Sequence, residues 1–80
     1  MRLVTLQELV VGNTYVSKVV AKPGAATTSR EERPWTLLHV DTHDPDLTLL
    51  TVRYLDAEPI MPKVVLASSG QDWYREFYER

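Results

Sequence analysis

The stretch from residue 35 to residue 55, WTLLHVDTHDPDLTLLTVRYL, decides the fold, because it holds two runs of strand-forming residues on either side of a turn. Residues 35–42 and 47–55 are rich in Leu, Val, Thr and aromatic side chains, which favour β-strands. Between them, Asp44-Pro45-Asp46 is typical of a type I turn, in which proline takes the first central position. The stretch therefore predicts an antiparallel hairpin with a three-residue turn.

The length of the turn sets the register of this hairpin. A three-residue turn places Val40 opposite Leu50 and Leu38 opposite Val52, so that four apolar side chains lie on one face and form a credible core. A two-residue turn would instead set the two first-strand residues beside a threonine and an arginine and would split this hydrophobic set. Because a one-residue slip moves every side chain to the other face, burial favours the three-residue version.

The opposite face of the hairpin carries His39, Asp41, His43 and Arg53, together with the apolar Leu37. Residues at i, i+2 and i+4 of a strand share a face, so two imidazoles and one carboxylate could converge on a divalent cation. However, successive same-face side chains on a strand are roughly 7 Å apart, which is long for a tight metal site. We therefore expect no metal and no cofactor, and we interpret the polar residues as a solvated strand end available to a partner.

Two further strands are predicted at residues 14–21 and 63–68, and four short strands separated by turns favour an antiparallel meander. Residues 22–34, KPGAATTSREERP, are small, polar and bounded by prolines, and this composition predicts a long mobile loop. Such a loop is either a tolerated hairpin connection or a segment that becomes ordered on a partner. In the second case Arg30 and Arg33 are the candidate contacts.

The two ends of the chain carry helix signals. Near the start, Thr5 as N-cap with Glu8 three residues later predicts one helical turn, and Gly12 is able to close it with a positive φ. Near the end, a serine and an aspartate three residues apart and two aromatic pairs spaced by four residues predict a short C-terminal helix within residues 69–78. A fifth strand is the alternative, but neither of its faces would be cleanly apolar. The candidate partner contacts in this segment are Tyr74, Arg75 and Tyr78.

Composition argues against several classes of function. The chain has 80 residues, enough for one small domain, with a formal net charge of −2, a pI of about 5.6 and no cysteine. The slight negative charge gives no general attraction to nucleic acid, and a fold without disulfides suits the cytoplasm. No stretch approaches the ~20 apolar residues that a membrane span needs. Because there is no Gly-x-Ser-x-Gly elbow and no Gly-rich phosphate loop, we expect no catalytic residues and no enzyme.

The opening Leu6-x-x-Leu9-x-x-Gly12-x-x-Tyr15, a helical turn that feeds a strand and a small meander, resembles the openings of compact SH3-like β-barrel proteins, including small accessory proteins of phages. The resemblance covers only this opening segment and the number of strands. It implies a binding module and assigns no functional residue. We therefore expect residues 1–80 to form one mainly β domain, an antiparallel meander or SH3-like, partly open barrel of four to five strands with an N-terminal helical turn and a short C-terminal helix.

The expected function is stoichiometric binding to another protein, as in a phage-encoded inhibitor of a host defence or transcription machine. Surplus aromatic residues and a charged loop motivate this expectation, because Tyr, Trp and Arg anchor protein interfaces. A nucleic-acid-binding small β-barrel is the first alternative, which the acidic balance disfavours. The second alternative is a protein that sequesters a nucleotide-like ligand as a homo-oligomer, since a meander with exposed edges gains by pairing with a second copy.

Overall fold

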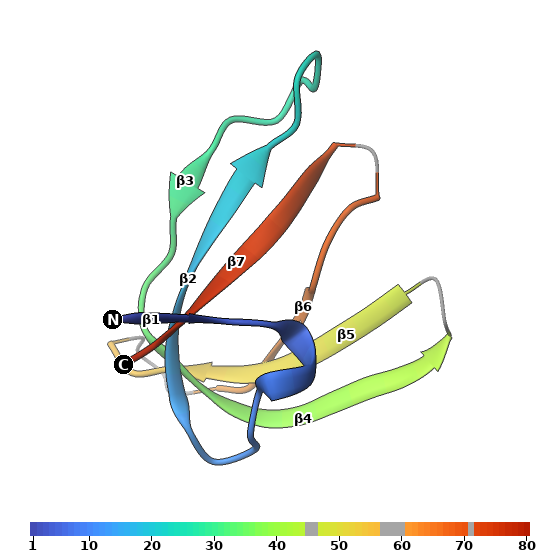
Figure 1. Ribbon diagram of the computed structural model, residues 1–80. Coiled ribbons are helices and arrows are strands. Elements are labelled where there is room, and N and C mark those ends of the chain that lie inside the picture. The colour runs from blue at the N-terminus through green and yellow to red at the C-terminus, as the bar shows by residue number, and fades with distance from the viewer. Residues whose placement is uncertain (45–46, 57–60, 71) are drawn as a thin grey trace.

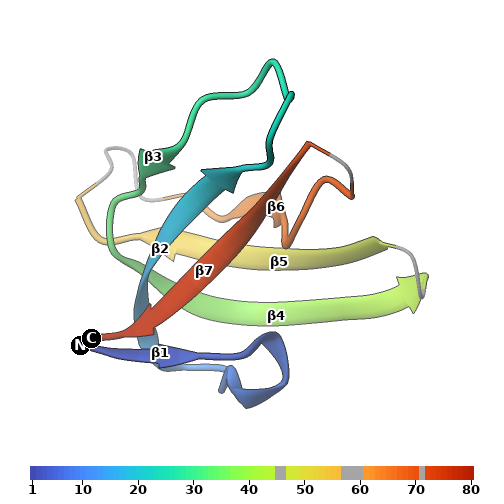
Figure 2. The same ribbon diagram turned by 45° about the horizontal axis from the view of Figure 1, so that its top comes forward.

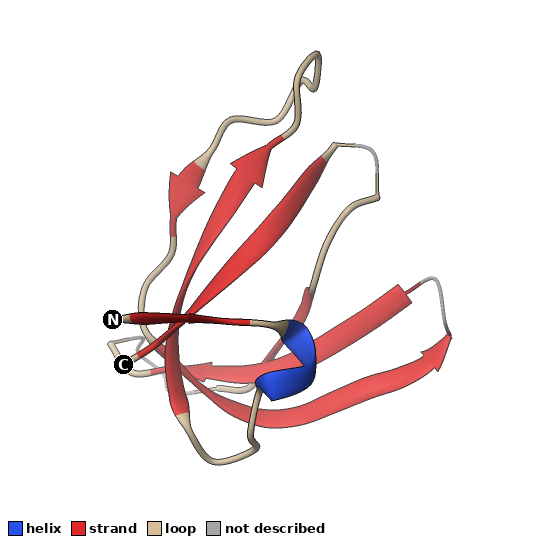
Figure 3. Ribbon diagram, in the orientation of Figure 1, coloured by secondary structure: helices blue, strands red, loops and turns tan. Residues whose placement is uncertain are grey.

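The computed structural model describes residues 1–44, 47–56, 61–70 and 72–80, and nearly all regular structure in them is β (Figure 3). The strands form one antiparallel sheet, and the helical element among the described residues is the 3₁₀ turn η1 (Leu6–Glu8). The strands are β1 (Arg2–Val4), β2 (Thr14–Ala21), β3 (Arg30–Glu31), β4 (Trp35–Asp44), β5 (Leu47–Tyr54), β6 (Lys63–Leu66) and β7 (Trp73–Glu79). The prediction of a mainly β domain is confirmed, with seven strands in the described residues where four to five were expected.

The strands are arranged in the order β1-β7-β2-β4-β5-β6, and β3 pairs with the second half of β2. Because β1 pairs with β7, the two chain ends lie side by side (Figures 1 and 2). β2 connects the two halves of the sheet, since it pairs with β7 along one edge and with β4 and β3 along the other. The sheet is not closed, although an isolated bridge between Ser68 and Tyr74 brings the segment after β6 onto β7.

The apolar core lies between the β2–β7 pair and the β4–β5 hairpin, which run at an angle to each other (Figures 1 and 2). Along β2 the buried residues are Tyr15, Ser17 and Val19, which is the period of two that a strand shows when one face meets the core. The ring centroid of Trp35 lies 5.5 Å from that of Tyr15 and 6.1 Å from that of Phe77, so three strands meet in one aromatic cluster. The other buried members of this core are Val4, Leu37, Leu50, Val52 and Ala67.

The central hairpin forms, and the predicted register is confirmed where Val40 pairs with Leu50. A β-bulge after Leu37 then shifts the pairing by one residue, so that Leu37 lies opposite Val52. Leu37 is fully buried and Leu38 is 36% exposed, so the predicted faces of these two leucines are wrong. The physical reason is the extra residue of the bulge, which turns the following side chains to the other side of the sheet.

The turn of this hairpin also differs from the prediction at its first residue. β4 runs to Asp44, which pairs with Leu47, so Asp44 belongs to the strand. The other two residues of the predicted turn, Pro45 and Asp46, lie outside the described residues. A second irregularity of pairing falls between Asp41 and Asp44. The predicted register therefore holds in the middle of the hairpin, and irregularities on both sides change it.

The C-terminal segment is the strand β7, and the prediction of a helix there is wrong. Trp73, Arg75 and Phe77 share the inner face of this strand, while Tyr74 and Tyr78 lie on its outer face. An arginine in the middle of the inner face makes the local sequence pattern look unsuitable for a strand. In the structure Arg75 is buried beside a carboxylate from a distant part of the chain, which a local pattern does not reveal.

Part of the segment predicted as a long loop, residues 22–34, pairs with β2. Arg30 and Glu31 form β3, and the backbone N–H of Glu32 donates a hydrogen bond of 2.9 Å to the carbonyl oxygen of Ser17. Residues 22–29 form the connection between β2 and β3. Consequently, Arg30 and the residues after it are held on the body of the domain.

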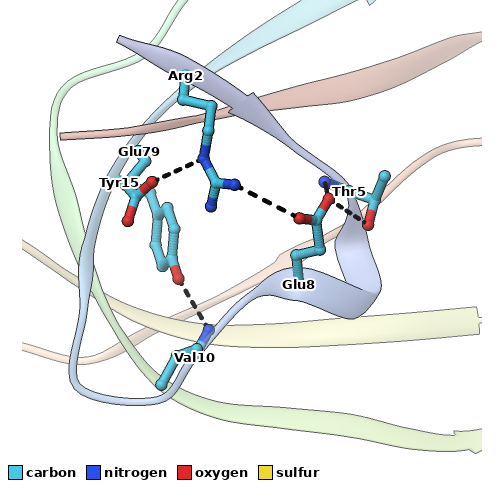
Figure 4. Close-up of polar contacts among 6 residues, drawn as sticks. All are labelled: Arg2, Thr5, Glu8, Val10, Tyr15 and Glu79. Carbon is cyan, nitrogen blue, oxygen red and sulfur yellow. Dashed lines mark hydrogen bonds and ion pairs between the residues drawn. The ribbon is translucent and has the colours of Figure 1, made fainter.

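The N-terminal segment contains the single 3₁₀ turn η1, and an α-helical turn is not supported. The carboxylate of Glu8 accepts hydrogen bonds from the backbone N–H and from the hydroxyl of Thr5, each 3.0 Å long (Figure 4). These two donors lower the pKa of Glu8, because they stabilise its charged form, and the nearby Arg2 acts in the same direction. Gly12 has a φ of +96°, so the glycine expected at a positive φ is confirmed.

Two side chains attach this N-terminal turn to the sheet. Arg2 lies between two carboxylates, at 3.0 Å from Glu79 of β7 and at 3.9 Å from Glu8 (Figure 4). The hydroxyl of Tyr15 accepts a hydrogen bond of 2.8 Å from the backbone N–H of Val10, so a core side chain also supports the chain just after the turn. Both contacts connect the start of the chain to β2 and β7.

The bulge in β4 predicts that substitutions of two adjacent leucines lower the stability of the domain by different amounts. Leu37→Ala should destabilise the domain by about 2–5 kcal/mol, because it leaves a cavity in the core, whereas Leu38→Ala should cost less than about 1 kcal/mol. Urea unfolding followed by tryptophan fluorescence measures both values. Equal costs, or the larger cost at Leu38, would contradict the register described above.

The hydrogen bonds of Glu8 predict a stability that depends on pH. A carboxyl with a lowered pKa stabilises the fold above its unfolded-state pKa, and this contribution is lost as the pH falls through the folded-state pKa. The melting temperature of Glu8→Gln should therefore be lower than wild type near pH 7 and should approach it in strong acid. Arg2→Gln, which leaves both Thr5 donors in place, should reduce this pH dependence less; the opposite ranking would count against the assignment to Thr5.

Candidate functional site

Glu32, in the link between β3 and β4, is the centre of a buried polar network. Its side chain is 8% exposed, and its two oxygens accept hydrogen bonds of 2.6 Å from Ser17 Oγ and 2.8 Å from Arg75 Nη2. Ser17 Oγ in turn accepts a hydrogen bond of 2.8 Å from Trp35 Nε1. One carboxylate therefore connects β2, β4 and β7, which are far apart in the sequence.

Arg75 supplies the charge that balances Glu32 in the interior. Its side chain is 4% exposed, its Nη1 donates to the carbonyl oxygen of Leu66, and its guanidinium lies 5.0 Å from the ring centroid of Trp73. A buried charge is costly unless it is paired and hydrogen-bonded, and this arginine is both. The prediction that Arg75 is a partly exposed partner contact is therefore wrong, because its side chain belongs to the interior.

A hollow of about 370 Å³ borders this network, and we call it the polar hollow. Its lining residues are Arg30, Glu31, Glu32, Arg33, Tyr54 and Lys63. The guanidinium of Arg33 lies 5.1 Å from the ring centroid of Tyr54. Burial raises the pKa of Tyr54, and the carboxylate of Glu32 adds to this effect, so the phenol stays protonated. The two predicted loop contacts, Arg30 and Arg33, thus meet in one place.

A second candidate surface is the side of β4, β5 and β6 that faces away from the core, which we call the outer face. The pairings of His39 with Thr51 and of Asp41 with Leu49 place both predicted residues on it, and Arg53 follows on the same side of β5. All three predicted side chains are exposed, and so is the fourth, His43, near the end of β4. The apolar members of the outer face are Leu38, Leu47, Leu49, Val64 and Leu66.

His39 and His43 are not part of a metal cluster among the described residues. Across residues 1–44, 47–56, 61–70 and 72–80, no group of three or more His, Asp or Glu side chains is placed to hold a metal ion. Instead, a carboxylate oxygen of Asp41 accepts a hydrogen bond of 2.9 Å from the backbone N–H of His43. Asp41 therefore bonds to the backbone two residues further along its own strand, as aspartate commonly does near a turn.

The remaining predicted contacts, Tyr74 and Tyr78, lie on the outer side of β7. Tyr74 is exposed, whereas Tyr78 is partly buried and its hydroxyl lies 3.3 Å from a carboxylate oxygen of Glu76. The predicted residues thus fall in separate places: the polar hollow, the outer face and the outer side of β7. The sequence interpretation did not single out Glu32 or Tyr54 as site residues; an arginine inside an otherwise apolar strand face was the signal for a buried acid elsewhere.

Comparison of this chain with protein-family models, with curated proteins and with solved structures finds no match. Among the helices of the described residues, none has the length and the apolar character needed to cross a membrane. We therefore infer the function from the geometry of the polar hollow and the outer face.

The buried pair predicts a large difference between two arginines that each face an acid. Arg75→Met leaves Glu32 buried and uncompensated and should cost about 3–5 kcal/mol. Arg33→Met should cost less than about 1 kcal/mol, because Arg33 and Asp56 lie 3.6 Å apart and both are more than half exposed. Urea unfolding measures both variants. The double variant Glu32→Leu/Arg75→Met should recover part of the loss; similar costs for the two arginines would contradict the burial described here.

Proposed function

We propose that this chain is a non-enzymatic binding module that acts by stoichiometric contact between its outer face and a partner protein. The observation that carries the proposal is a group of exposed apolar side chains on strands, outside the core. Val64 is 63% exposed, and Leu38 and Leu47 are exposed on neighbouring strands of the same face. Polar residues border this group, with His39 and Arg53 among them.

The arrangement has the anatomy of a protein interface, in which an apolar centre is surrounded by a polar rim. The strands hold these side chains in place, so a partner would order few groups on binding, and ordering is one of the main costs of association. The bulge in β4 contributes directly, because it turns Leu38 outward while Leu37 fills the core. A leucine that could serve the core is thereby presented to solvent.

We also propose that the open sheet is a variant of a small SH3-like barrel. Support comes from the opening segment, in which Tyr15 is buried and accepts a hydrogen bond from Val10, so that the helical turn and the first long strand are fixed to each other. Folds of this kind commonly act as binding modules. A small module that acts only by covering a surface of its partner could inhibit a larger machine. A phage-encoded inhibitor of a host defence or transcription machine would be a protein of this kind.

The test compares two substitutions of matched chemistry on the two end strands of the sheet, β6 and β1. Val64→Asp places a charge on the outer face, and Leu3→Asp places one on an exposed side chain far away in the strand order. Because both side chains are exposed, both variants should keep the wild-type stability to within about 0.5 kcal/mol. We expect Val64→Asp to abolish capture of a partner from a bacterial lysate, and Leu3→Asp to retain it, as measured by quantitative mass spectrometry.

The proposal fails if both variants capture the same proteins as the wild type, or if only nucleic acid is recovered. Light scattering on the purified wild type provides the remaining comparison. A dimer that dissociates on Val64→Asp substitution would mean that the outer face binds a second copy of this chain, which also contradicts a separate partner.

A further inference from the structure

We propose that the polar hollow binds a small phosphate-bearing ligand, either inorganic phosphate or the phosphate group of a small metabolite. This site lies apart from the outer face, and its function would be additional to partner binding. Its cations come from separate segments: Arg30 from β3, Arg33 from the link before β4, and Lys63 from the first position of β6. They meet because Trp35 pairs with Tyr54 and Val52 pairs with Lys63, which brings the start of β4, the end of β5 and the start of β6 together.

Glu32, the buried acid at the hollow, does not neutralise these cations. Both oxygens of Glu32 are engaged by groups on the interior side, Ser17 at 2.6 Å and Arg75 at 2.8 Å. Arg30 lies 3.8 Å from Glu32, beyond hydrogen-bonding distance, and is 60% exposed. Because Arg75 already balances the charge of Glu32, the guanidinium of Arg30 remains available to an anion.

The other two cations are also open to a ligand. Arg33 meets Asp56 at 3.6 Å, but more than half of each side chain is exposed, and such pairs are weak and easily exchanged. Lys63 is exposed and forms no ion pair within the described part of the chain. Around the hollow, these three cations stand against the exposed acids Glu31 and Asp56 among the described residues, so positive charge is in excess.

The uncharged phenol of Tyr54 and the size of the hollow both favour a phosphate group. The phenol of Tyr54 stays protonated and can donate a hydrogen bond to an anion, and its ring positions Arg33 above it. Guanidinium groups bind phosphate through paired, charge-assisted hydrogen bonds. The volume of about 370 Å³ lies at the lower end of the range for small-ligand sites, which suits a small molecule.

The test is a titration of the full chain with inorganic phosphate at constant ionic strength, followed by ¹H–¹⁵N NMR spectra. Saturable shifts should appear at the amides of residues 30–33 and 63. The double variant Arg33→Gln/Lys63→Gln should weaken binding by about tenfold or more, since it removes two of the three cations that would hold the anion.

The matched control is Lys22→Gln/Arg80→Gln, which makes the same change in net charge at exposed residues outside the hollow and outside the outer face. The control should bind phosphate within about twofold of the wild type, because distant surface charges are screened by salt. The spectra themselves report that each variant is folded. Shifts that do not saturate, equal losses in both double variants, or binding of a single-stranded oligonucleotide without binding of phosphate would each overturn the proposal. A nucleoside monophosphate that binds more tightly than phosphate, with the same dependence on Arg33 and Lys63, would identify the metabolite as the ligand source.

Discussion

The contact between Glu32 and Arg75 is the interaction on which the rest of this structure depends. The two residues lie 43 positions apart in the sequence, and both are almost fully withdrawn from solvent. Neither charge is tolerable in the interior alone, so β7 must present Arg75 inward and the link before β4 must bring Glu32 to it. A one-residue slip of β7 against β2 would turn Arg75 outward and leave Glu32 uncompensated. The attraction within such a pair is largely offset by desolvation, so its main effect is to select one register.

The contact between Glu32 and Arg75 also affects the charge of the polar hollow. Because Arg75 balances Glu32 from the inside, Glu32 does not offset the cations on its outer side, and the described residues of the polar hollow carry an excess of positive charge in a chain whose net charge is −2. The outer face of β4, β5 and β6 depends on a different feature, the bulge after Leu37. The two surfaces have separate structural causes, so a substitution in one is expected to leave the other intact.

The sequence predicts those parts of the fold that local patterns control. The bounds of β2, residues 14–21, and the first residues of β4, β5 and β6 follow from β-rich runs and agree with the structure. Parity along the hairpin also places His39, Asp41 and Arg53 correctly on the side away from the core. The C-terminal strand does not follow from its own residues, because its inner face is completed by a carboxylate from elsewhere. The same holds for the polar hollow, where Arg30 and Arg33 are visible as charges in the sequence but Tyr54 and Lys63 join them only through strand pairing.

The bulge in β4 and the buried arginine of β7 are the two features that depart from the local sequence pattern. The bulge leaves Leu38 36% exposed, and β7 buries Arg75, whose charge costs free energy in the interior unless it is paired. For Arg75 the compensation is inside the molecule, in Glu32 and the carbonyl of Leu66. Leu38 instead lies on the outer face, which also carries the exposed Leu47 and Val64. Sequences tend to break local rules at sites that have another role, and under the proposed function a binding partner would cover the outer face.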